Sequence, residues 1–405
     1  MLVILLSVLF LGYTAIIGEK YFPFSKGVAA LGMAAISWIV VFFMHTAKEP
    51  EFFFQVRAIL QNTGEIVFFL FTLILIVEVM HVNHAFEPIK TWLNKISSSS
   101  LIAVIAIVTF FLSSILDNLA TTILMFQLGA HFFPDSSLKK KLGALIVVAA
   151  NAGGVFSPIG DITTTMLWLE NCITTKKIIL SLFFPSLLAF FFPFVWSWLQ
   201  RRKTTKNSYK IATKIKGKGI LVAGILLLLS IPFLHAWLHL SPLVGGSIAL
   251  SILLVPYLFS KGSTKEKIAT LFFSIDFSAM AVFLGTLLTI GAFQLGSILA
   301  QIPPILEPYL DNTWAMGGFF MVFSALGGAI SFIAALIQSY SHLPPDHSLW
   351  ILAAYSAGIG GSLTLIGSPA GLYLMGKENI GFFFYLRYIG LPTFIGAMAG
   401  LFLLA

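Results

Sequence analysis

Long apolar runs constrain the fold of this chain more than any other feature. Runs of roughly 20 apolar residues recur along its length, for example residues 27–46, 178–200 and 382–404. A helix of that length crosses the hydrocarbon core of a bilayer, whereas a β-barrel needs short alternating segments. Only 10% of the residues are charged, against roughly 25% in ordinary soluble domains. The sequence therefore predicts an all-α polytopic membrane protein that lies in a lipid bilayer.

The apolar runs fall into two kinds. Uninterrupted spans are expected over residues 1–18, 27–46, 64–82, 178–200, 219–235, 242–260, 276–300 and 382–404. Gly, Pro, Asp or Asn interrupts the apolar runs 101–133, 141–170, 313–340 and 349–375. Residues 87–97 form a short amphipathic segment that we place along the membrane interface. In total we expect about 11 spans.

Basic residues set the expected orientation. Residues 201–218 hold eight Lys and Arg, so the positive-inside rule places this loop in the cytoplasm. If 101–133 and 313–340 are re-entrant hairpins, whose two ends share one side, only four of the 24 basic residues lie outside: Lys48, Arg57, Lys176 and Lys177. If each run crosses once, eight lie outside. The hairpin topology is favoured, with the N-terminus outside. It also explains the net charge of +8 without a nucleic-acid partner.

An internal repeat supports the same arrangement. The segment Gly153-Gly-Val-Phe-Ser-Pro-Ile-Gly-Asp161 shares a pattern with Gly360-Gly-Ser-Leu-Thr-Leu-Ile-Gly-Ser368, far along the chain. We expect one membrane transport domain, 1–405, in which 1–26 form a first span and loop. Two repeats of opposite orientation follow, 27–200 and 219–405, joined by the linker 201–218. Inverted repeats whose broken helices meet near the membrane midplane are typical of secondary transporters.

Two interrupted runs carry carboxylates, Asp117 beside Asn118 and Asp161. A carboxylate is costly to bury in apolar surroundings, so we expect both to serve a function. The polar residues around them offer only hard oxygen atoms, which suit an alkali cation or a proton rather than a soft transition metal. The candidate ligands for Na+ or a proton are Asp117, Asn118, Thr121, Thr122, Asn151, Ser157, Asp161, Thr163 and Thr164. From the second repeat we add Ser324, Ser362, Thr364 and Ser368.

Structural roles compete with these assignments. Asp117 could cap a helix at a hairpin tip, and Asp161 could be a turn residue, although a capping carboxylate can also bind an ion. Glu65, Glu78 and His81 are candidates for proton relay or pH sensing, because His titrates near neutral pH. Plain placement at the membrane interface explains them as well.

Two stretches resemble a known family. Ser113–Met125 and Ala150–Trp168 are similar to the signature segments of NhaD-type sodium/proton antiporters, in the ion-transporter superfamily. Thr63–Leu70, Ile76–Met80, Phe283–Ala292 and Ala357–Gly376 add to the resemblance. It implies exchange of Na+ or Li+ for H+, with Asp117 and Asp161 at the positions that bind cation and proton. It also implies a bacterial inner membrane, a homodimer, and no cofactor beyond the transported ions.

The second repeat departs from the family pattern. Gly328 and Ala329 stand where a second Asp-Asn pair is usual, and Gln294 stands where we expect Glu. This loss favours the alternative of an anion transporter of the same superfamily, for a carboxylate, sulfate or arsenite, whereas Asp117 and Asp161 oppose it. A membrane-embedded enzyme is a third class, but no nucleophile has a base at plausible spacing, and nothing indicates ATP hydrolysis.

Overall fold

The computed structural model describes residues 2–17, 25–44, 50–130, 132–133, 136–200, 217–238, 240–258, 271, 277–296, 306–309, 312–326, 329–377 and 380–405. Within these ranges the chain is helical and has no strands, which confirms the all-α prediction. Four of the described helices are long and apolar enough to cross a membrane: Phe52–Val82, Thr175–Leu199, Lys218–His235 and Phe382–Phe402. The basic residues 201–216 and Gly328 lie outside the described residues.

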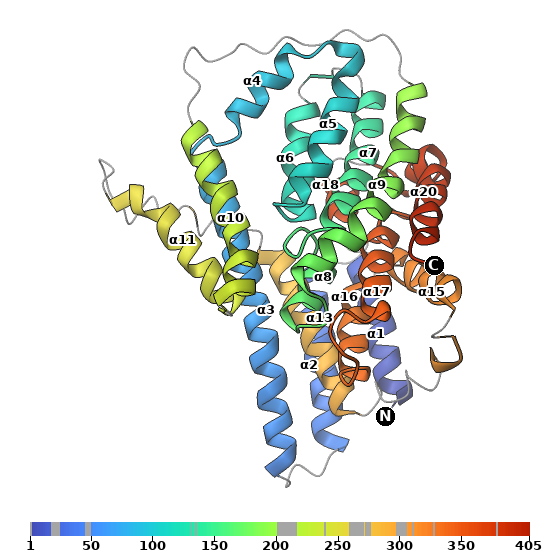
Figure 1. Ribbon diagram of the computed structural model, residues 1–405. Helices are drawn as coiled ribbons and strands as arrows, with labels where there is room; N and C mark the ends of the chain where they lie inside the picture. Colours follow the sequence, from blue (N-terminus) through green and yellow to red (C-terminus); the bar gives the residue numbers. More distant parts are fainter. Residues whose placement is uncertain are drawn as a thin grey trace.

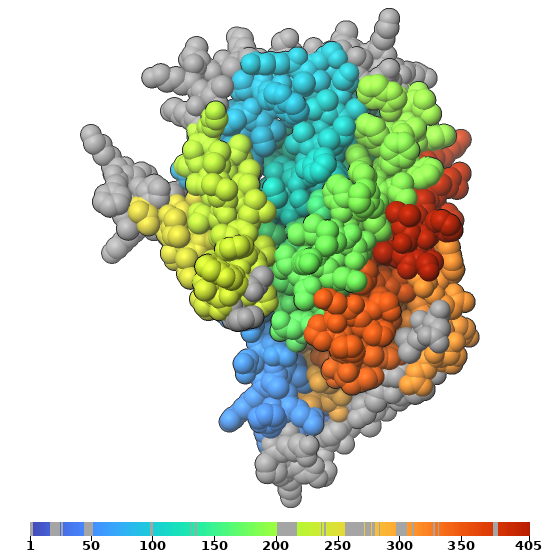
Figure 2. All heavy atoms as spheres, in the orientation of Figure 1, coloured from blue at the N-terminus to red at the C-terminus, as the bar shows by residue number. Residues whose placement is uncertain are grey.

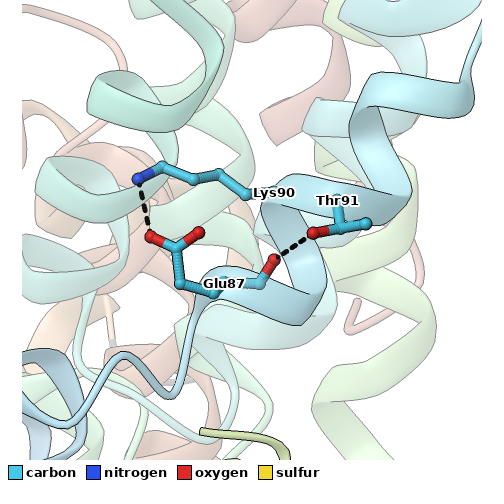
Figure 3. Close-up of polar contacts among 3 residues, drawn as sticks. All are labelled: Glu87, Lys90 and Thr91. Carbon is cyan, nitrogen blue, oxygen red and sulfur yellow. Dashed lines mark hydrogen bonds and ion pairs between the residues drawn. The ribbon is translucent and has the colours of Figure 1, made fainter. Parts of the chain in front are cut away.

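Three helices and a short crossing helix begin the chain (Figure 1). They are α1 (Leu2–Ile17), α2 (Lys26–Met44), α3 (Pro50–Val82) and α4 (Glu87–Lys95). Helix α4 occupies the interfacial segment expected at 87–97. Its first turn carries an ion pair between Glu87 and Lys90, with the carboxylate and the ammonium 3.1 Å apart (Figure 3).

Helix α3 begins at Pro50, well before the span expected at 64–82. The first position of a helix suits proline, because the missing N–H would be unpaired there. From Glu51 to Asn62 the chain holds neither Gly nor Pro, so nothing stops the helix, and Gly64 is tolerated inside it. At 33 residues the helix is about 50 Å long, and its N-terminal end projects below the other helices in Figure 1.

The rest of the first half packs around α7. Helices α5 (Ser98–Ser113) and α6 (Asn118–Ala130) contact each other and both lie against α7 (Ser136–Val155). After a break at 156–161 the chain continues as α8 (Ile162–Leu169) and then α9 (Thr175–Leu199). The break follows from Pro158, which has no N–H to donate and disfavours a helical conformation at Ser157.

The second half repeats this order of elements. Helices α10 (Lys218–Leu238), α11 (Pro242–Leu258) and α13 (Phe277–Leu295) come first, and η3 (Glu307–Tyr309) follows. Helices α15 (Thr313–Ala325) and α16 (Ala329–Ser339) contact each other and α17 (Ser348–Gly360). A break at 361–368 precedes α18 (Pro369–Lys377). The last helical run comprises α19 (Phe382–Tyr385), the π-turn η4 (Leu386–Gly390) and α20 (Leu391–Phe402).

The two halves pack directly on each other. Helix α2 lies along α13, α9 lies along α20, and α7 contacts α17. Helices α10 and α11 stand on one flank against α3, as the yellow-green surface of Figure 2 shows. Their outer side chains, such as Leu226, Phe233 and Trp237, are exposed, as expected of side chains that face lipid.

A proline at the start of α20 explains a bond between α9 and the preceding turn η4. Pro392 cannot donate to the carbonyl four residues earlier, that of Tyr388. The indole N–H of Trp196 donates to this carbonyl at 2.8 Å. A backbone acceptor that would be costly to leave unpaired inside a membrane is therefore satisfied from the neighbouring helix.

Matching glycines hold each hairpin-like pair to its broken helix. Gly153 in α7 lies directly against the backbone carbonyl of Phe110 in α5. Gly360, its counterpart in the second half, lies against the backbone of Met321 in α15 in the same way. A Cβ atom at either glycine would meet backbone, which cannot move aside as a flexible side chain can.

Replacing Gly153 with Ala tests this contact. We expect the Gly153→Ala substitution to cost about 1–3 kcal/mol, the usual penalty for overpacking, and to lower the melting temperature of the detergent-solubilised protein. Gly64→Ala is the matched control, since nothing lies within 4 Å of the Cβ it would add, and Ala favours helix over Gly. An unchanged melting temperature in Gly153→Ala would contradict the close approach.

Candidate functional site

The second helix break lies against the broken helix of the first half. Asn151, near the end of α7, donates hydrogen bonds from its amide nitrogen to the hydroxyls of Ser362 and Ser368, both at 3.0 Å. These two serines stand at the ends of the second break, in the other half of the chain. One amide therefore joins the break of the second half to the broken helix of the first.

Asp161 lies at the start of α8 and is only 9% exposed. Its Oδ2 accepts hydrogen bonds from the backbone N–H of Thr163, at 3.1 Å, and from the Thr163 hydroxyl. Its Oδ1 accepts from the amide nitrogen of Asn118 at 2.5 Å. Asn118 in turn accepts from the Ser113 hydroxyl at 2.9 Å. The carboxylate is thus fixed by its own helix and by the tip between α5 and α6.

A cavity of about 90 Å³ opens beside Asp161. The polar side chains of its wall come from both halves of the chain: Tyr13, Asn118, Asn151, Asp161, Thr163, Thr286 and Ser368. A cavity needs roughly 10–15 Å³ to hold one water molecule, so this one has room for a cation and several waters. No Lys, Arg or His stands among its described lining residues.

One acceptor in the cavity wall has no partner. The amide oxygen of Asn151 is buried and makes no hydrogen bond among the described residues, while the nitrogen of the same amide makes two. Buried polar atoms in proteins are nearly always paired, so an unpaired one points to a water or an ion. The hydroxyls of Thr121 and Thr122 are also buried and find no partner in the part of the chain that the structure describes, although neither residue lines the cavity.

Asp117 occupies a different position from Asp161. Its Oδ1 accepts from the backbone N–H groups of Leu119, at 2.9 Å, and Ala120, at 3.0 Å. It therefore caps α6, which is the structural role that the sequence left open. Asp117 is half-buried and does not line the cavity, so it could reach an ion there only through its neighbour Asn118 or through a change of rotamer.

Most other predicted ligands bond to backbone near the breaks. The hydroxyls of Thr164, Ser324 and Thr364 donate to the carbonyls of Val155, Ala357 and Ala325, and Ser157 accepts from the N–H of Ile159. The bonds of Thr164 and Thr364 satisfy carbonyls at the ends of α7 and α15, whereas the Ala357 carbonyl also accepts from the N–H of Gly361. The four residues shape the cavity and are not part of its wall.

The three candidates for proton relay lie on α3, away from the cavity wall. Glu65 accepts a hydrogen bond from the Ser241 hydroxyl, next to α11. Glu78 and His81 form a pair 3.9 Å apart near the end of the helix. None of the three lines the cavity, and their assignment to proton relay or pH sensing stays a prediction.

Two polar residues of the cavity wall were missed from the sequence. Tyr13 comes from α1 and Thr286 from α13. A signal for Thr286 exists, because Phe283-Leu-Gly-Thr-Leu287 matches Phe69-Leu-Phe-Thr-Leu73 of the first repeat. Tyr13 is one of several polar residues in an apolar run, and only the packing of α1 against α2 brings it to the site.

The chemistry of the wall favours a small cation. Every polar group named above offers oxygen, and a carboxylate supplies the negative charge. The N-terminal end of α8, which would attract an anion, already holds the carboxylate of Asp161. An anionic ligand would meet that carboxylate without a basic side chain to offset the repulsion.

Comparison with known proteins gives consistent results. Residues 13–354 match a family model described as "Citrate transporter". The sequence is 33% identical to "Sodium/proton antiporter 1" of Arabidopsis thaliana, over 96% of this chain and 70% of that protein. It is 32% identical to "Sodium/proton antiporter 2" of the same plant, over 96% of each.

A bacterial relative extends the comparison. "Na(+)/H(+) antiporter NhaD" of Vibrio cholerae is 26% identical, over 91% of this chain and 84% of that protein. These relatives confirm the resemblance drawn from Ser113–Met125 and Ala150–Trp168.

The two hydrogen bonds from Asn151 to Ser362 and Ser368, called here the Asn151 bridge, predict that substitutions at the three residues have non-additive effects on stability. Asn151→Ala should cost about 1–3 kcal/mol because it removes two buried hydrogen bonds, to Ser362 and Ser368. The triple variant, with Ser362→Ala and Ser368→Ala added, should lose clearly less than the sum of Asn151→Ala and the double serine variant. Melting temperatures of the purified proteins measure this cycle, and additive losses would argue against the bridge.

Proposed function

The chain belongs to the citrate transporter family, and on that premise we propose that it exchanges Na+ or Li+ for H+ across a membrane as a secondary transporter. Membership of a family of transporters confirms that the protein is a transporter and not an enzyme. The exchanged ions are taken from the names of the relatives, which describe sodium/proton antiporters in a plant and in bacteria.

The observation that carries the proposal is the pairing of Asp161 with an unpartnered amide oxygen at one cavity. Asp161 supplies a carboxylate, and Asn151 supplies a buried carbonyl that lacks a donor. Na+ and Li+ are hard cations and prefer such oxygen ligands. The structure thus offers a charge and a free acceptor in a space of the right size.

Competition for one carboxylate explains how the two fluxes would be coupled. An ionised Asp161 can hold the cation, whereas a protonated Asp161 cannot, because the proton occupies an oxygen and removes the charge. If the site opens to each side in turn, a cation leaves on the side where a proton replaces it. Asn118 bonds the same carboxylate and would keep it oriented in both states.

We propose that Asp117 takes part in the same exchange indirectly, without lining the cavity. It stands next to Asn118 and holds the N-terminus of α6. Through this capping bond it would position Asn118 against Asp161. Of the other candidate ligands, Thr163 and Ser368 line the cavity and are included in the proposed cation and proton site. Ligand roles for Thr121, Thr122, Ser157, Thr164, Ser324, Ser362 and Thr364, which do not line it in this conformation, stay predictions.

The order of elements supports an inverted repeat. A pair of packed helices precedes a broken helix in each half, and the matched contacts of Gly153 and Gly360 relate the two halves. We propose that α5–α6 and α15–α16 are re-entrant hairpins, opening to the cytoplasm and to the outside respectively. The repeats then span 27–200 and 219–405, with a cytoplasmic linker at 201–218.

The membrane and the assembly follow from the same family argument. We propose a bacterial inner membrane with the N-terminus outside, and a homodimer as the working unit. The relatives include both bacterial and plant proteins, so a membrane that maintains a proton gradient is the shared requirement.

An anion transporter is the second candidate, because the description of the family names citrate. Two observations weigh against it. The described wall of the cavity holds no basic side chain, and Asp161 would repel a carboxylate substrate at close range. The family description therefore counts for less here than the chemistry of the cavity wall.

Removing the charge of Asp161 should abolish exchange. We expect Asp161→Asn to show no Na+- or Li+-dependent recovery of a pH dye in inverted vesicles, because a neutral amide cannot alternate between proton and cation. Asp117→Asn should abolish exchange too, because it removes the second negative charge of the proposed site, while the Asn amide oxygen can still accept the capping bonds of α6. Expression of both variants is checked by immunoblot of the membranes.

The wild type decides the wider claim in the same assay. If the wild type gives no response to Na+ or Li+ at any pH from about 6.5, near the reference pKa of His, to about 9.5, below that of Tyr, the proposed exchange is rejected. Wild-type exchange in either Asn variant would remove that residue from the site.

The topology has its own test at Ser341, which is exposed in the turn after α16. In a Cys172→Ser background, a Ser341→Cys variant should react with a membrane-impermeant maleimide added outside. The native thiol adds little background even when present, because burial, and then the charge of Glu170, raises the pKa of Cys172 to about 12. Labelling from the cytoplasmic side alone would contradict a second hairpin that opens outward.

A further inference from the structure

A second cavity lies among α3, α8, α13 and α16. Its volume is about 190 Å³, roughly twice that of the cavity beside Asp161. Its polar lining consists of one carboxyl group, four amides and one hydroxyl: Gln55, Asn62, Thr63, Glu170, Gln294 and Gln338. Gln55, Asn62 and Gln294 are exposed, whereas Thr63 is buried, so the cavity has an open mouth and a closed inner end.

Three helices lead from the Asp161 cavity to this one. On α8 the lining passes from Thr163 to Met166 and then to Glu170. On α13 it passes from Thr286 to Ile290 and Gln294, and on α16 from Ile330 to Ala334 and Gln338. Each step is three or four residues, which is one turn on a helix. The second cavity therefore continues the first along the same three helix faces.

An apolar layer separates the two cavities. Met166, Ile290 and Ala334 form it, one residue from each of the three helices. All three side chains are buried. A hydrated ion in the outer space would meet this layer before it reached Asp161.

The field in the second cavity favours a cation. Helices α8, α13 and α16 end at Leu169, Leu295 and Ser339, so all three present C-terminal ends, with their partial negative charge, near its polar residues. Glu170 adds a carboxyl group. No Lys, Arg or His stands among the described lining residues.

An unpaired acceptor gives independent support. The amide oxygen of Gln338 is buried and makes no hydrogen bond among the described residues. It lines the same cavity as Glu170. Buried acceptors call for a donor or a cation, and the described wall offers no donor in bonding position.

We propose that this cavity is an entry vestibule that binds a partly hydrated alkali cation through Glu170 and the amide oxygens of Gln294 and Gln338. A single carboxylate balances one positive charge, and the volume leaves room for part of the hydration shell. The identity of the cation as Na+ or Li+ rests on the proposed function. In the proposed topology, the vestibule lies at the outer end of the path to Asp161.

Glu170→Gln tests the vestibule because its effect should depend on the side of the membrane from which Na+ is supplied. The charge raises the local cation concentration, so its loss should raise the Na+ concentration for half-maximal exchange by about tenfold when Na+ is supplied outside. The maximal rate should stay near that of wild type, and inverted vesicles, which present the cytoplasmic side, should show no change. Right-side-out and inverted vesicles measure the two cases.

Two further variants keep the test decisive. Glu87→Gln removes the same group from the Glu87–Lys90 pair of α4 (Figure 3), remote from the vestibule lining, and should leave the outside Na+ dependence unchanged. Gln338→Glu adds a carboxylate to the vestibule and should lower the half-maximal Na+ concentration outside. An unchanged outside value in both Glu170→Gln and Gln338→Glu, or an equal change from both sides, overturns the proposal.

A binding measurement separates this proposal from the proposed function. Purified Asp161→Asn protein lacks the inner carboxylate, and its remaining sodium binding is followed by line broadening in sodium NMR. We expect Glu170→Gln in that background to remove most of the broadening. Equal broadening in the two proteins overturns the vestibule even if wild-type exchange is normal. Broadening that depends on Glu170 supports it even if wild-type vesicles exchange nothing.

Discussion

Backbone groups at a helix break must find partners inside the protein, because lipid supplies none. Much of the arrangement around Asp161 follows from this requirement. Side chains near the breaks substitute for missing helical bonds: the hydroxyl of Thr364 donates to the carbonyl of Ala325, at the end of α15, and that of Thr164 to the carbonyl of Val155, at the end of α7. Asp161, at the end of the first break, and Ser368, at the end of the second, line one polar cavity together with Asn151.

The handling of charge follows the same logic. A buried carboxylate is tolerated where hydrogen bonds and a helix N-terminus offset its lost hydration. Asp161 has both, through Thr163, Asn118 and the start of α8. Using the helix end in this way leaves it unable to attract an external anion. A helix N-terminus usually favours phosphate or carboxylate ligands. Here it stabilises the carboxylate of Asp161, and the site therefore favours a cation.

How much of this could be predicted from the sequence depended on the range of the interaction. The helical class, the broken runs and the residues beside Asp117 and Asp161 follow from apolar length and local composition. The start of α3 was misplaced because residues 50–63 are mixed in polarity, and hydropathy alone does not detect a helix that extends past the hydrocarbon core. The contribution of Tyr13, and the bond of Asn151 to Ser362 and Ser368, depend on packing between distant segments, which no local pattern encodes. The different placements of Asp117 and Asp161 were also beyond the sequence, since both follow a break and both can cap a helix.

The glycine contacts bear on how such a protein could move. Gly153 and Gly360 bring backbone against backbone, and surfaces in such contact slide past each other only with large strain. Each packed helix pair and its broken helix should then travel as a rigid block. Motion between the blocks would fall on contacts made by single side chains, such as the two hydrogen bonds of Asn151 to the second half. The Asn151 amide, which joins the two halves in this conformation, would then break and re-form its hydrogen bonds once in each transport cycle.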